Sequence, residues 1–121
     1  MEYEILIALG SNYEQLQNVE KAKAGLQTLF PNIRFSRSLW TEPIGIESPR
    51  FVNALAEAYT SLPQDEIVRQ LKRLEQECGR TAEKKKQGII RIDLDLMQYG
   101  TERLHPEDWD REYIVTLLED L

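Results

Sequence analysis

The chain has 121 residues, of which 41% are hydrophobic and 30% charged, a length and balance that suit one globular domain with one core. Its net charge of −6 argues against a general nucleic-acid-binding protein, because such proteins usually carry a basic surface. No apolar run approaches the length of a membrane span, and the N-terminal residues lack the basic start and apolar core of a signal peptide.

The first part of the chain has the pattern of a strand followed by a helix. Apolar side chains fall on both faces of an alternating stretch over residues 3–9, which predicts a central β-strand. Gly10 permits a tight exit from this strand. Apolar residues then recur at helical spacing, which predicts a helix over residues 13–30, and Pro31 ends it.

Two further strands are predicted over residues 33–40 and 51–60, because the alternation returns in both segments. The intervening residues 41–50 contain too many prolines and glycines for regular structure. This segment is either a binding loop or a plain hairpin connection, and its composition favours neither. Phe51 and Asn53 share one face of the third strand. They form either a stacking and hydrogen-bonding site for a flat heterocycle or an ordinary exposed surface.

A second helix is predicted over residues 63–78 from apolar residues at helical spacing, and Gly79 suits the position that ends it. Cys78 falls on the apolar stripe of this helix, so we expect a buried structural residue rather than a reactive thiol. As the only cysteine, it excludes an intramolecular disulfide and favours a cytoplasmic protein. Residues 80–88 are polar and basic and are predicted as a mobile loop. Its lysines are either a solvated surface or a contact to phosphate.

The stretch over residues 90–96 alternates strictly, which predicts a half-buried strand with Arg91, Asp93 and Asp95 on its polar face. Asp is a poor strand former, so two of them in one strand need a reason. Same-face neighbours lie about 6.5–7 Å apart. Two such carboxylates can converge on one cation or on two metal ions ~3.5–4 Å apart. Either this strand carries a Mg²⁺–nucleotide site, or it presents a solvated face whose charge Arg91 partly offsets.

A short terminal helix from about residue 110 completes the order strand, helix, strand, strand, helix, strand, helix. This order is typical of the ferredoxin-like α+β fold, a βαββαβ antiparallel sheet with two helices on one face. The opposite face of the sheet is expected to be less covered. Asp93, Asp95 and Asn53 are expected to point toward that face.

Six ordered pieces of the sequence carry a family resemblance. They are Ala8-Leu9-Gly10-Ser11-Asn12, Trp40-Thr41-Glu42-Pro43-Ile44-Gly45, Phe51-Val52-Asn53-Ala54, Glu75 with Gly79-Arg80, Asp93-Leu94-Asp95-Leu96-Met97, and His105-Pro106 with Arg111 and Tyr113. Through these pieces the chain resembles 6-hydroxymethyl-7,8-dihydropterin pyrophosphokinase, an enzyme of folate synthesis. The pieces span nearly the whole chain, so residues 1–121 are expected to form a single domain of that kind.

The resemblance implies an activity and a set of catalytic residues. The family transfers a pyrophosphoryl group from ATP to the hydroxymethyl oxygen of the pterin and releases AMP. By resemblance, Asp93 and Asp95 hold two Mg²⁺ ions that bridge the ATP phosphates. Arg80 stabilises charge on those phosphates, for which its planar fork is suited.

The same resemblance assigns residues to the two substrates. On the nucleotide side it places Glu75, Arg80, His105 and Arg111. On the pterin side it places Ile44, Gly45, Phe51, Asn53 and Tyr113. The partners it implies are therefore small molecules, ATP and a pterin, with neither nucleic acid nor a membrane.

The sequence departs from the family pattern next to the paired aspartates. The family usually has a Pro-Arg pair where this chain has Ile89 and Ile90, and an aromatic residue in place of Gln87. Arg91 lies one residue nearer the carboxylates and, by strand alternation, on their face. It is the candidate to replace the missing arginine as a catalytic residue. A lost arginine contact costs ~10²–10³ in rate.

These departures support a second hypothesis of another class, namely a ferredoxin-like binding or regulatory module that keeps the scaffold without turnover. A third hypothesis, a nucleic-acid binder that uses the open sheet face, fits poorly with the net charge and with two aspartates on that face. The resemblance therefore favours a Mg²⁺- and ATP-dependent pterin pyrophosphokinase.

Overall fold

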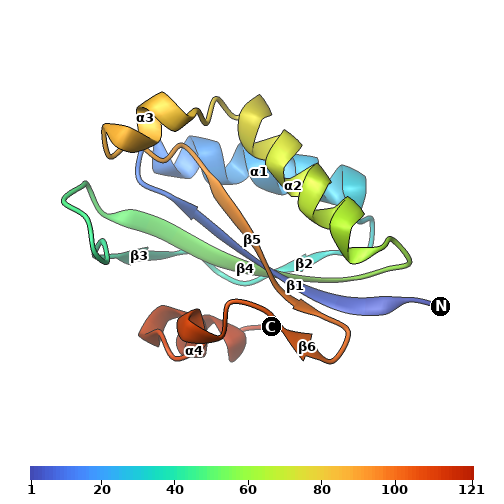
Figure 1. The fold of residues 1–121 in the computed structure, drawn as a ribbon. Coiled ribbons are helices and arrows are strands. Elements are labelled where there is room, and N and C mark those ends of the chain that lie inside the picture. Colours follow the sequence, from blue (N-terminus) through green and yellow to red (C-terminus); the bar gives the residue numbers. More distant parts are fainter.

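The first strand of the chain lies in the middle of a six-stranded antiparallel sheet (Figure 1). A computed structural model describes residues 1–121. The elements follow in the order β1 (Tyr3–Ser11), α1 (Gln15–Leu29), β2 (Arg34–Phe35), β3 (Leu39–Thr41), β4 (Phe51–Thr60), α2 (Gln64–Glu77), α3 (Ala82–Lys86), β5 (Asp93–Tyr99), β6 (Glu102–Arg103), the 3₁₀ helix η1 (Pro106–Asp108) and α4 (Glu112–Leu118).

The order of the strands confirms the predicted ferredoxin-like α+β arrangement. Along the sheet the order is β2-β4-β1-β5-β6, and the short β3 also pairs with β4. β1 is paired on both edges, by β4 and by β5. Its two faces are both apolar because Ile5, Ile7 and Leu9 enter the core on one side of the sheet and Leu6 enters the core on the other. The prediction of a central first strand is therefore confirmed, as is the third predicted strand, which is β4.

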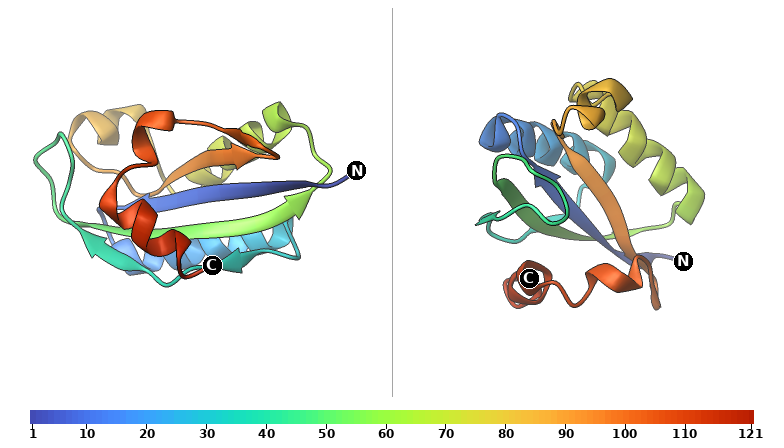
Figure 2. Two further views of the ribbon diagram at one scale, coloured as in Figure 1. Left: turned by 90° about the horizontal axis from the view of Figure 1, so that it is seen from below. Right: turned by 60° about the vertical axis from the view of Figure 1, so that its left-hand side comes forward.

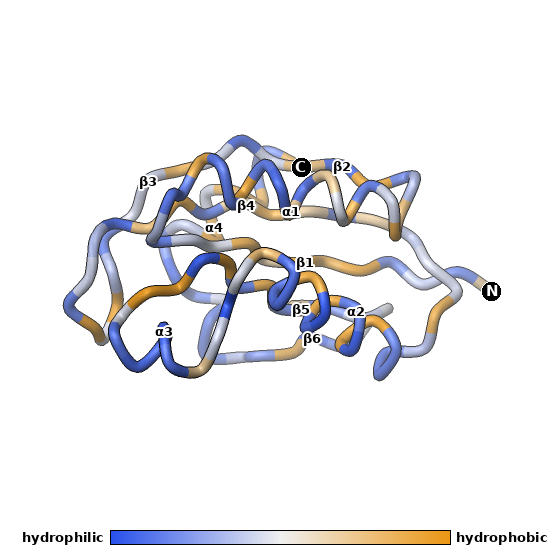
Figure 3. The backbone as a smooth tube through the Cα atoms, turned by 90° about the horizontal axis from the view of Figure 1, so that it is seen from above, coloured by the Kyte–Doolittle hydropathy of each residue, from blue (hydrophilic) through white to orange (hydrophobic).

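Helices α1 and α2 cover one face of the sheet and enclose the larger of two hydrophobic cores. From β1 the buried side chains are Ile5, Ile7 and Leu9, and α2 contributes Ile67 and Leu71. Figure 3 shows the hydrophobic and hydrophilic residues alternating around both helices. Each fully buried aliphatic side chain stabilises the fold by about 1.5–3 kcal/mol. This core fixes α2 over β5, and so fixes the C-terminal end of α2 beside the start of that strand.

Helix α4 covers part of the opposite face, as Figures 1 and 2 show. A smaller core lies there, in which Met97 of β5 meets Trp109, Ile114 and Leu117. The predicted terminal helix is thus present. It covers part of the sheet face opposite α1 and α2, which was expected to be less covered, and leaves that face open only toward the start of β5. Neither β6 nor η1 was predicted, because two- and three-residue elements leave no periodic pattern.

The predicted strand over residues 33–40 is wrong in extent, since the structure divides it into β2 and β3. The buried Ser36 causes the break. Its backbone donates to Leu55 O at 2.8 Å, while its own Oγ accepts a hydrogen bond from Leu55 N at 2.8 Å. A side-chain oxygen therefore replaces a backbone partner in the ladder, which interrupts regular pairing.

The predicted strand over residues 90–96 also starts later than expected, at Asp93. Asn12, which is buried at the exit of β1, holds the preceding segment. Its Oδ1 accepts from Ile90 N and its Nδ2 donates to Gly88 O, both at 2.7 Å. These bonds between distant parts of the chain take the place of a strand ladder before Asp93.

The segment predicted as a mobile loop, 80–88, contains the five-residue helix α3. Thr81 caps it, because its Oγ1 accepts a hydrogen bond from Lys84 N at 3.1 Å. Before it, Gly79 ends α2 with a φ of 91°, a conformation that favours glycine, as predicted.

Cys78 is buried, in agreement with the prediction, and burial raises the pKa of its thiol. None of the helices combines the length and the apolarity that crossing a bilayer requires.

Candidate active site

The polar face of the sheet carries a row of three residues from neighbouring strands. Gly10 of β1 pairs with Asn53 of β4 on one side and with Asp93 of β5 on the other. Directly paired residues of antiparallel strands point to the same face. In the next row on this face, Ala8 pairs with Asp95. The prediction that Asn53 and both aspartates share the face opposite α1 and α2 is therefore confirmed.

Gly10 leaves the space that the side chain of Asn53 occupies. A Cβ atom at this position would lie 2.7 Å from Asn53 Oδ1, which is closer than real Cβ contacts allow. Asn53 is buried, and its Nδ2 donates a hydrogen bond to Thr41 Oγ1 at 2.5 Å. The amide is therefore held in one orientation by β3 and by the absence of a side chain in β1.

Asp93 belongs to an ionic network at the junction of α2 and β5. Arg80 Nη1 donates to Asp93 Oδ1 at 2.7 Å and to Glu75 Oε2 at 2.8 Å. Glu75 Oε2 also accepts a hydrogen bond from Leu94 N at 2.7 Å, so it binds the edge of β5 directly. The side chains of Arg80 and Glu75 are only 19% and 12% exposed. Their positions follow from the end of α2 at Gly79, which turns the chain back toward β5.

Burial and like charge shift the pKa values of the carboxyl groups in this network. Burial raises the pKa of Asp95 to about 7, and the neighbouring Asp93 carboxyl adds to the rise. Burial also raises the pKa of Glu75, against the opposing effects of the Leu94 amide and of Arg80. Ionised, the two aspartates repel each other, and a bound cation would relieve that repulsion.

A hollow of about 490 Å³ opens along β5 between α2 and the segment that follows β6. It is lined by Gln64, Val68, Leu71, Lys72, Glu75, Arg80, Asp93, Leu94, Asp95, Leu96, Leu104 and His105. The side chains of Val68, Leu71 and Leu104 make part of its wall apolar, whereas the ionic network makes another part polar. We call it the β5 hollow.

A second hollow, of about 240 Å³, lies over the row of paired residues. It is lined by Gly10, Thr41, Glu42, Ile44, Ile46, Phe51, Asn53, Ile90, Asp93, Arg111 and Tyr113. We call it the β4 hollow. Asp93 is the only residue that lines both hollows. Groups bound in the two hollows would therefore meet at this carboxylate.

Four of the predicted pterin-side residues line the β4 hollow, and Gly45 lies between two of its lining residues. Gly45 has a φ of 78°, so the loop needs glycine at this point. Burial raises the pKa of the Tyr113 hydroxyl, although its hydrogen bond with Arg111 acts in the opposite direction. The sequence had no signal for Thr41 as the partner of Asn53, because that contact depends on how β3 pairs with β4.

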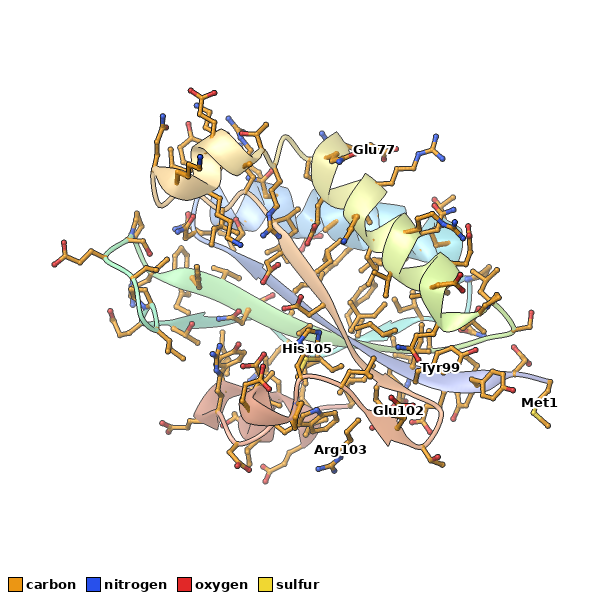
Figure 4. The ribbon with its side chains drawn as sticks, in the orientation of Figure 1. Met1, Glu77, Tyr99, Glu102, Arg103 and His105 are labelled. Carbon is orange, nitrogen blue, oxygen red and sulfur yellow. The ribbon has the colours of Figure 1, made fainter.

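Three of the predicted nucleotide-side residues, Glu75, Arg80 and His105, line the β5 hollow. Figure 4 shows His105 beneath β5, on the side of α4. Its φ of 51° places it in the left-handed region at the turn into η1. Arg111 differs from the expectation, because it lines the β4 hollow and pairs with Asp108 at 3.0 Å. It begins α4, which lies below β4 rather than beside β5.

Arg91 also differs from the expectation, because it does not share the face of the aspartates. Its guanidinium lies 4.7 Å from the ring centre of Tyr13 and 3.6 Å from Glu14, at the start of α1. It packs closely against Gly79 and lines neither the β5 nor the β4 hollow. Alternation fails as a guide here because β5 begins only at Asp93.

The fold and the site together define a class of protein. It is a ferredoxin-like α+β domain in which Asp93 lies between a larger hollow with a polar ionic network and a smaller hollow with aromatic and amide side chains. Comparison with known proteins gives the particular family. The profile of 7,8-dihydro-6-hydroxymethylpterin-pyrophosphokinase matches residues 6–121, and the chain belongs to that family.

Similar proteins come from plants and bacteria. The chain is 30% identical, over 97% of its length, to 2-amino-4-hydroxy-6-hydroxymethyldihydropteridine pyrophosphokinase of Porphyromonas gingivalis, of which it covers 89%. It is 32% identical to the protein of the same name in Haemophilus influenzae, over 95% of this chain and 79% of that one. It is 30% identical to a folate synthesis bifunctional protein of Arabidopsis thaliana, over 98% of its own length. It spans only 27% of that plant protein.

Proposed function

We propose that this protein transfers pyrophosphate from ATP to 6-hydroxymethyl-7,8-dihydropterin and releases AMP. The observation that carries the proposal is that Asp93 lines both hollows. A nucleotide in the β5 hollow and a pterin in the β4 hollow would bring a phosphate chain and a hydroxymethyl group to the same carboxylate. The family of the chain and the names of its relatives support the same reaction. Elements from β1 to α4 line these hollows, so we also propose that residues 1–121 act as one domain.

The orientation we propose for ATP follows the polarity of the β5 hollow. Val68, Leu71 and Leu104 offer an apolar surface for the flat base. Glu75, Arg80 and Asp93 lie where the ionic network meets the hollow, which suits the phosphates once cations are present. The β-phosphorus then lies near Asp93, within reach of a hydroxyl from the β4 hollow.

The donor set fits magnesium. Asp93 and Asp95 supply carboxylate oxygens from one face of one strand, and Mg²⁺ prefers such oxygens together with phosphate and water. We propose that these two residues hold two ions. When bound, the ions neutralise charge on the phosphates and on the attacking and leaving oxygens. The raised pKa of Asp95 is consistent with a carboxyl group that awaits a cation.

The remaining residues bind and orient the substrates. Arg80 donates from the side of α2, where its fork can move from Asp93 to a phosphate oxygen. Asn53, fixed by Thr41, offers amide groups to the edge of the pterin, and Phe51 and Tyr113 wall the ring. In the reaction, the hydroxymethyl oxygen forms a bond to the β-phosphorus while the bond from the β-phosphorus to the oxygen that bridges it to the α-phosphate breaks. That oxygen leaves as part of AMP, and the hydroxyl proton passes to solvent.

The second candidate function, a binding or regulatory module without turnover, has one observation in its favour. Ile90 lines the β4 hollow, and Arg91 points away from the aspartates, so residues 89–91 bring no cation to the phosphates. One assay separates the two functions. AMP and pterin diphosphate are quantified by chromatography after incubation with ATP, Mg²⁺ and the pterin.

Equal amounts of AMP and pterin diphosphate, lost in an Asp93→Asn variant, are the expected result. Binding of both substrates without either product would support the module instead. AMP release that is unchanged in the variant would show contamination or another active site, and would remove the proposal.

A further inference from the structure

Two segments that belong to no strand contribute aliphatic side chains to the wall of the β4 hollow. The loop 42–50 supplies two isoleucines, and the segment 87–91 supplies Ile90. The left view of Figure 2 shows the loop between β3 and β4 at the same end of the molecule as α3, which precedes the segment 87–91. The shape of the hollow therefore depends on where these two segments are held.

The hydrophobic core does not hold either segment between its ends. None of the residues in 42–50 or in 82–91 is buried. The backbone amides of Gly88 and Ile89 donate to carbonyl groups of α3, which is itself a helix without buried residues. Polar contacts from another part of the chain are therefore needed to fix both segments.

Asn12, between β1 and α1, supplies three such contacts to the segment 87–91. Its backbone amide donates to Ile90 O at 3.0 Å, its Oδ1 accepts from Ile90 N at 2.7 Å, and its Nδ2 donates to Gly88 O at 2.7 Å. Asn12 is only 2% exposed, so water does not compete well for these bonds. A side chain needs both a donor and an acceptor to make the last two bonds, and the amide of asparagine provides both.

Gln15, the first residue of α1, supplies a contact to the loop 42–50. Its Nε2 donates a hydrogen bond to Arg50 O at 3.0 Å. The loop and the segment 87–91 also lie against each other, because a Cβ atom at Gly88 would be 3.5 Å from Glu47 O, an ordinary contact distance. A shift of the segment that Asn12 holds would therefore also disturb the loop.

We propose that Asn12 is a positioning residue for the pterin, which holds Ile90 and, through Gly88, the loop 42–50 in the places that shape the β4 hollow. Gln15 assists by holding the end of that loop. This inference rests on the proposed function for the placement of the pterin in the β4 hollow. A wall that is already ordered binds more tightly, because binding does not have to order it.

The expected effect is confined to one substrate. Neither Asn12 nor Gln15 lines the β5 hollow, and neither the loop 42–50 nor the segment 87–91 contributes a residue to it. Loss of the Asn12 contacts should therefore weaken the pterin much more than the nucleotide. The entropy of ordering a single residue is enough to change an affinity about tenfold.

The first test compares Asn12→Ala with Asn32→Ala. Asn32 uses its amide in the same way, since its Nδ2 donates to Tyr59 O and its Oδ1 accepts from Tyr59 N, both at 3.1 Å, at the far end of β4. Fluorescence titration with 6-hydroxymethyl-7,8-dihydropterin should show affinity about 10- to 30-fold weaker for Asn12→Ala and within about twofold of wild type for Asn32→Ala. Calorimetric titration with Mg²⁺ and an ATP analogue that has carbon in place of the α,β-bridging oxygen should give affinities within about threefold for both variants.

Two further measurements separate positioning from general stability. In steady-state assays of Asn12→Ala, the loss should raise KM for the pterin and leave kcat within about threefold. Hydrogen exchange, measured without ligand, should become faster in the segment 87–91 and the loop 42–50 of this variant, and should stay unchanged there in Asn32→Ala.

A second pair of variants keeps the test decisive if Asn12→Ala does not fold, which thermal unfolding reports. Gln15→Ala removes one contact at the surface and should weaken the pterin by about three- to tenfold. Gln17→Ala, at an exposed position two residues along α1, should stay within about twofold. Unchanged pterin affinity in a folded Asn12→Ala, or in Gln15→Ala if the former does not fold, would overturn the proposal. Equal weakening of the pterin in Asn32→Ala, or equal weakening of pterin and analogue, would overturn it too.

The inference and the proposed function fail in different ways. If wild-type protein forms AMP and pterin diphosphate, and Asn12→Ala binds the pterin as Asn32→Ala does, the function stands and the positioning role is wrong. If pterin affinity depends on Asn12 but no AMP is formed, the positioning role stands and the pyrophosphokinase activity is wrong. A wild type that binds no pterin would overturn both.

Discussion

Replacing Asp95 by asparagine should stabilise the metal-free protein at alkaline pH. Burial and the Asp93 charge raise the pKa of Asp95 from 3.8 to about 7, so the folded state holds a proton that the unfolded chain has lost. Below pH 3.8 the carboxyl group is protonated in both the folded and the unfolded state, and the folded state is at its most stable with respect to this group. This stability is lost as the pH rises from 3.8 through about 7, because the unfolded chain gives up the proton more readily than the folded one. Asparagine is neutral at every pH and avoids this loss.

The size of the effect follows from the shift. One pKa unit corresponds to about 1.36 kcal/mol, so ionisation between pH 5 and about 7 costs at most about 2.7 kcal/mol. Part of the side chain reaches solvent in the β5 hollow, which reduces this to about 1–2 kcal/mol. The free energy of unfolding of Asp95→Asn, relative to wild type, should therefore rise by that amount between pH 5 and pH 8.

Urea unfolding with a chelator at both pH values measures the difference. The control is Asp110→Asn, at an exposed aspartate that forms no ion pair in the structure. Its stability relative to wild type should be the same at both pH values. If Asp95→Asn destabilises the protein at pH 8, or shows one constant difference at both, then the aspartates do not repel each other as described.

Further predictions concern the two substrate hollows and the metal. The Cβ atom in Gly10→Ala would force Asn53 from its position, so pterin affinity in a fluorescence titration should fall by about tenfold or more. Affinity for an ATP analogue whose α,β-bridging oxygen is replaced by carbon should stay within about twofold. Unchanged pterin affinity would contradict the role of the amide. Glu75→Gln removes the charge that anchors Arg80, so urea unfolding should show a loss of about 1–3 kcal/mol; no loss would mean that the ionic network is not stabilising. Mg²⁺ affinity, measured by calorimetry, should rise as the pH increases from 6 to 8, because Asp95 must lose its proton first; a flat profile would contradict the raised pKa.

Elements with strong periodicity could be predicted from the sequence. β1, β4, α1 and α2 each have a long apolar pattern, and their bounds are within about two residues of the expected ones. The shared face of Asp93 and Asp95 followed from alternation alone. The same reasoning extended to Asn53, because the order of strands sets its place beside Gly10.

Contacts between distant segments could not be predicted. Asn12 holds the backbone before β5 through bonds to residues far along the chain, and no local pattern indicates that. The strand therefore begins late, and Arg91 lies against Tyr13 instead of beside the aspartates. Arg111 lines the β4 hollow because the smaller core, which contains Trp109 and Ile114, holds α4 against the sheet at β4. No local sequence pattern indicates where that helix packs.

The number of divalent ions that the protein binds decides whether Asp93 and Asp95 form its metal site. Mn²⁺ can stand in for Mg²⁺, and electron paramagnetic resonance counts the ions bound with the ATP analogue and the pterin present. Two ions per wild-type chain are expected. When both aspartates are replaced by asparagine, we expect at most the one ion that a nucleotide brings with it. Two ions bound with equal affinity in that double variant would contradict the claim that this pair of carboxylates forms the metal site.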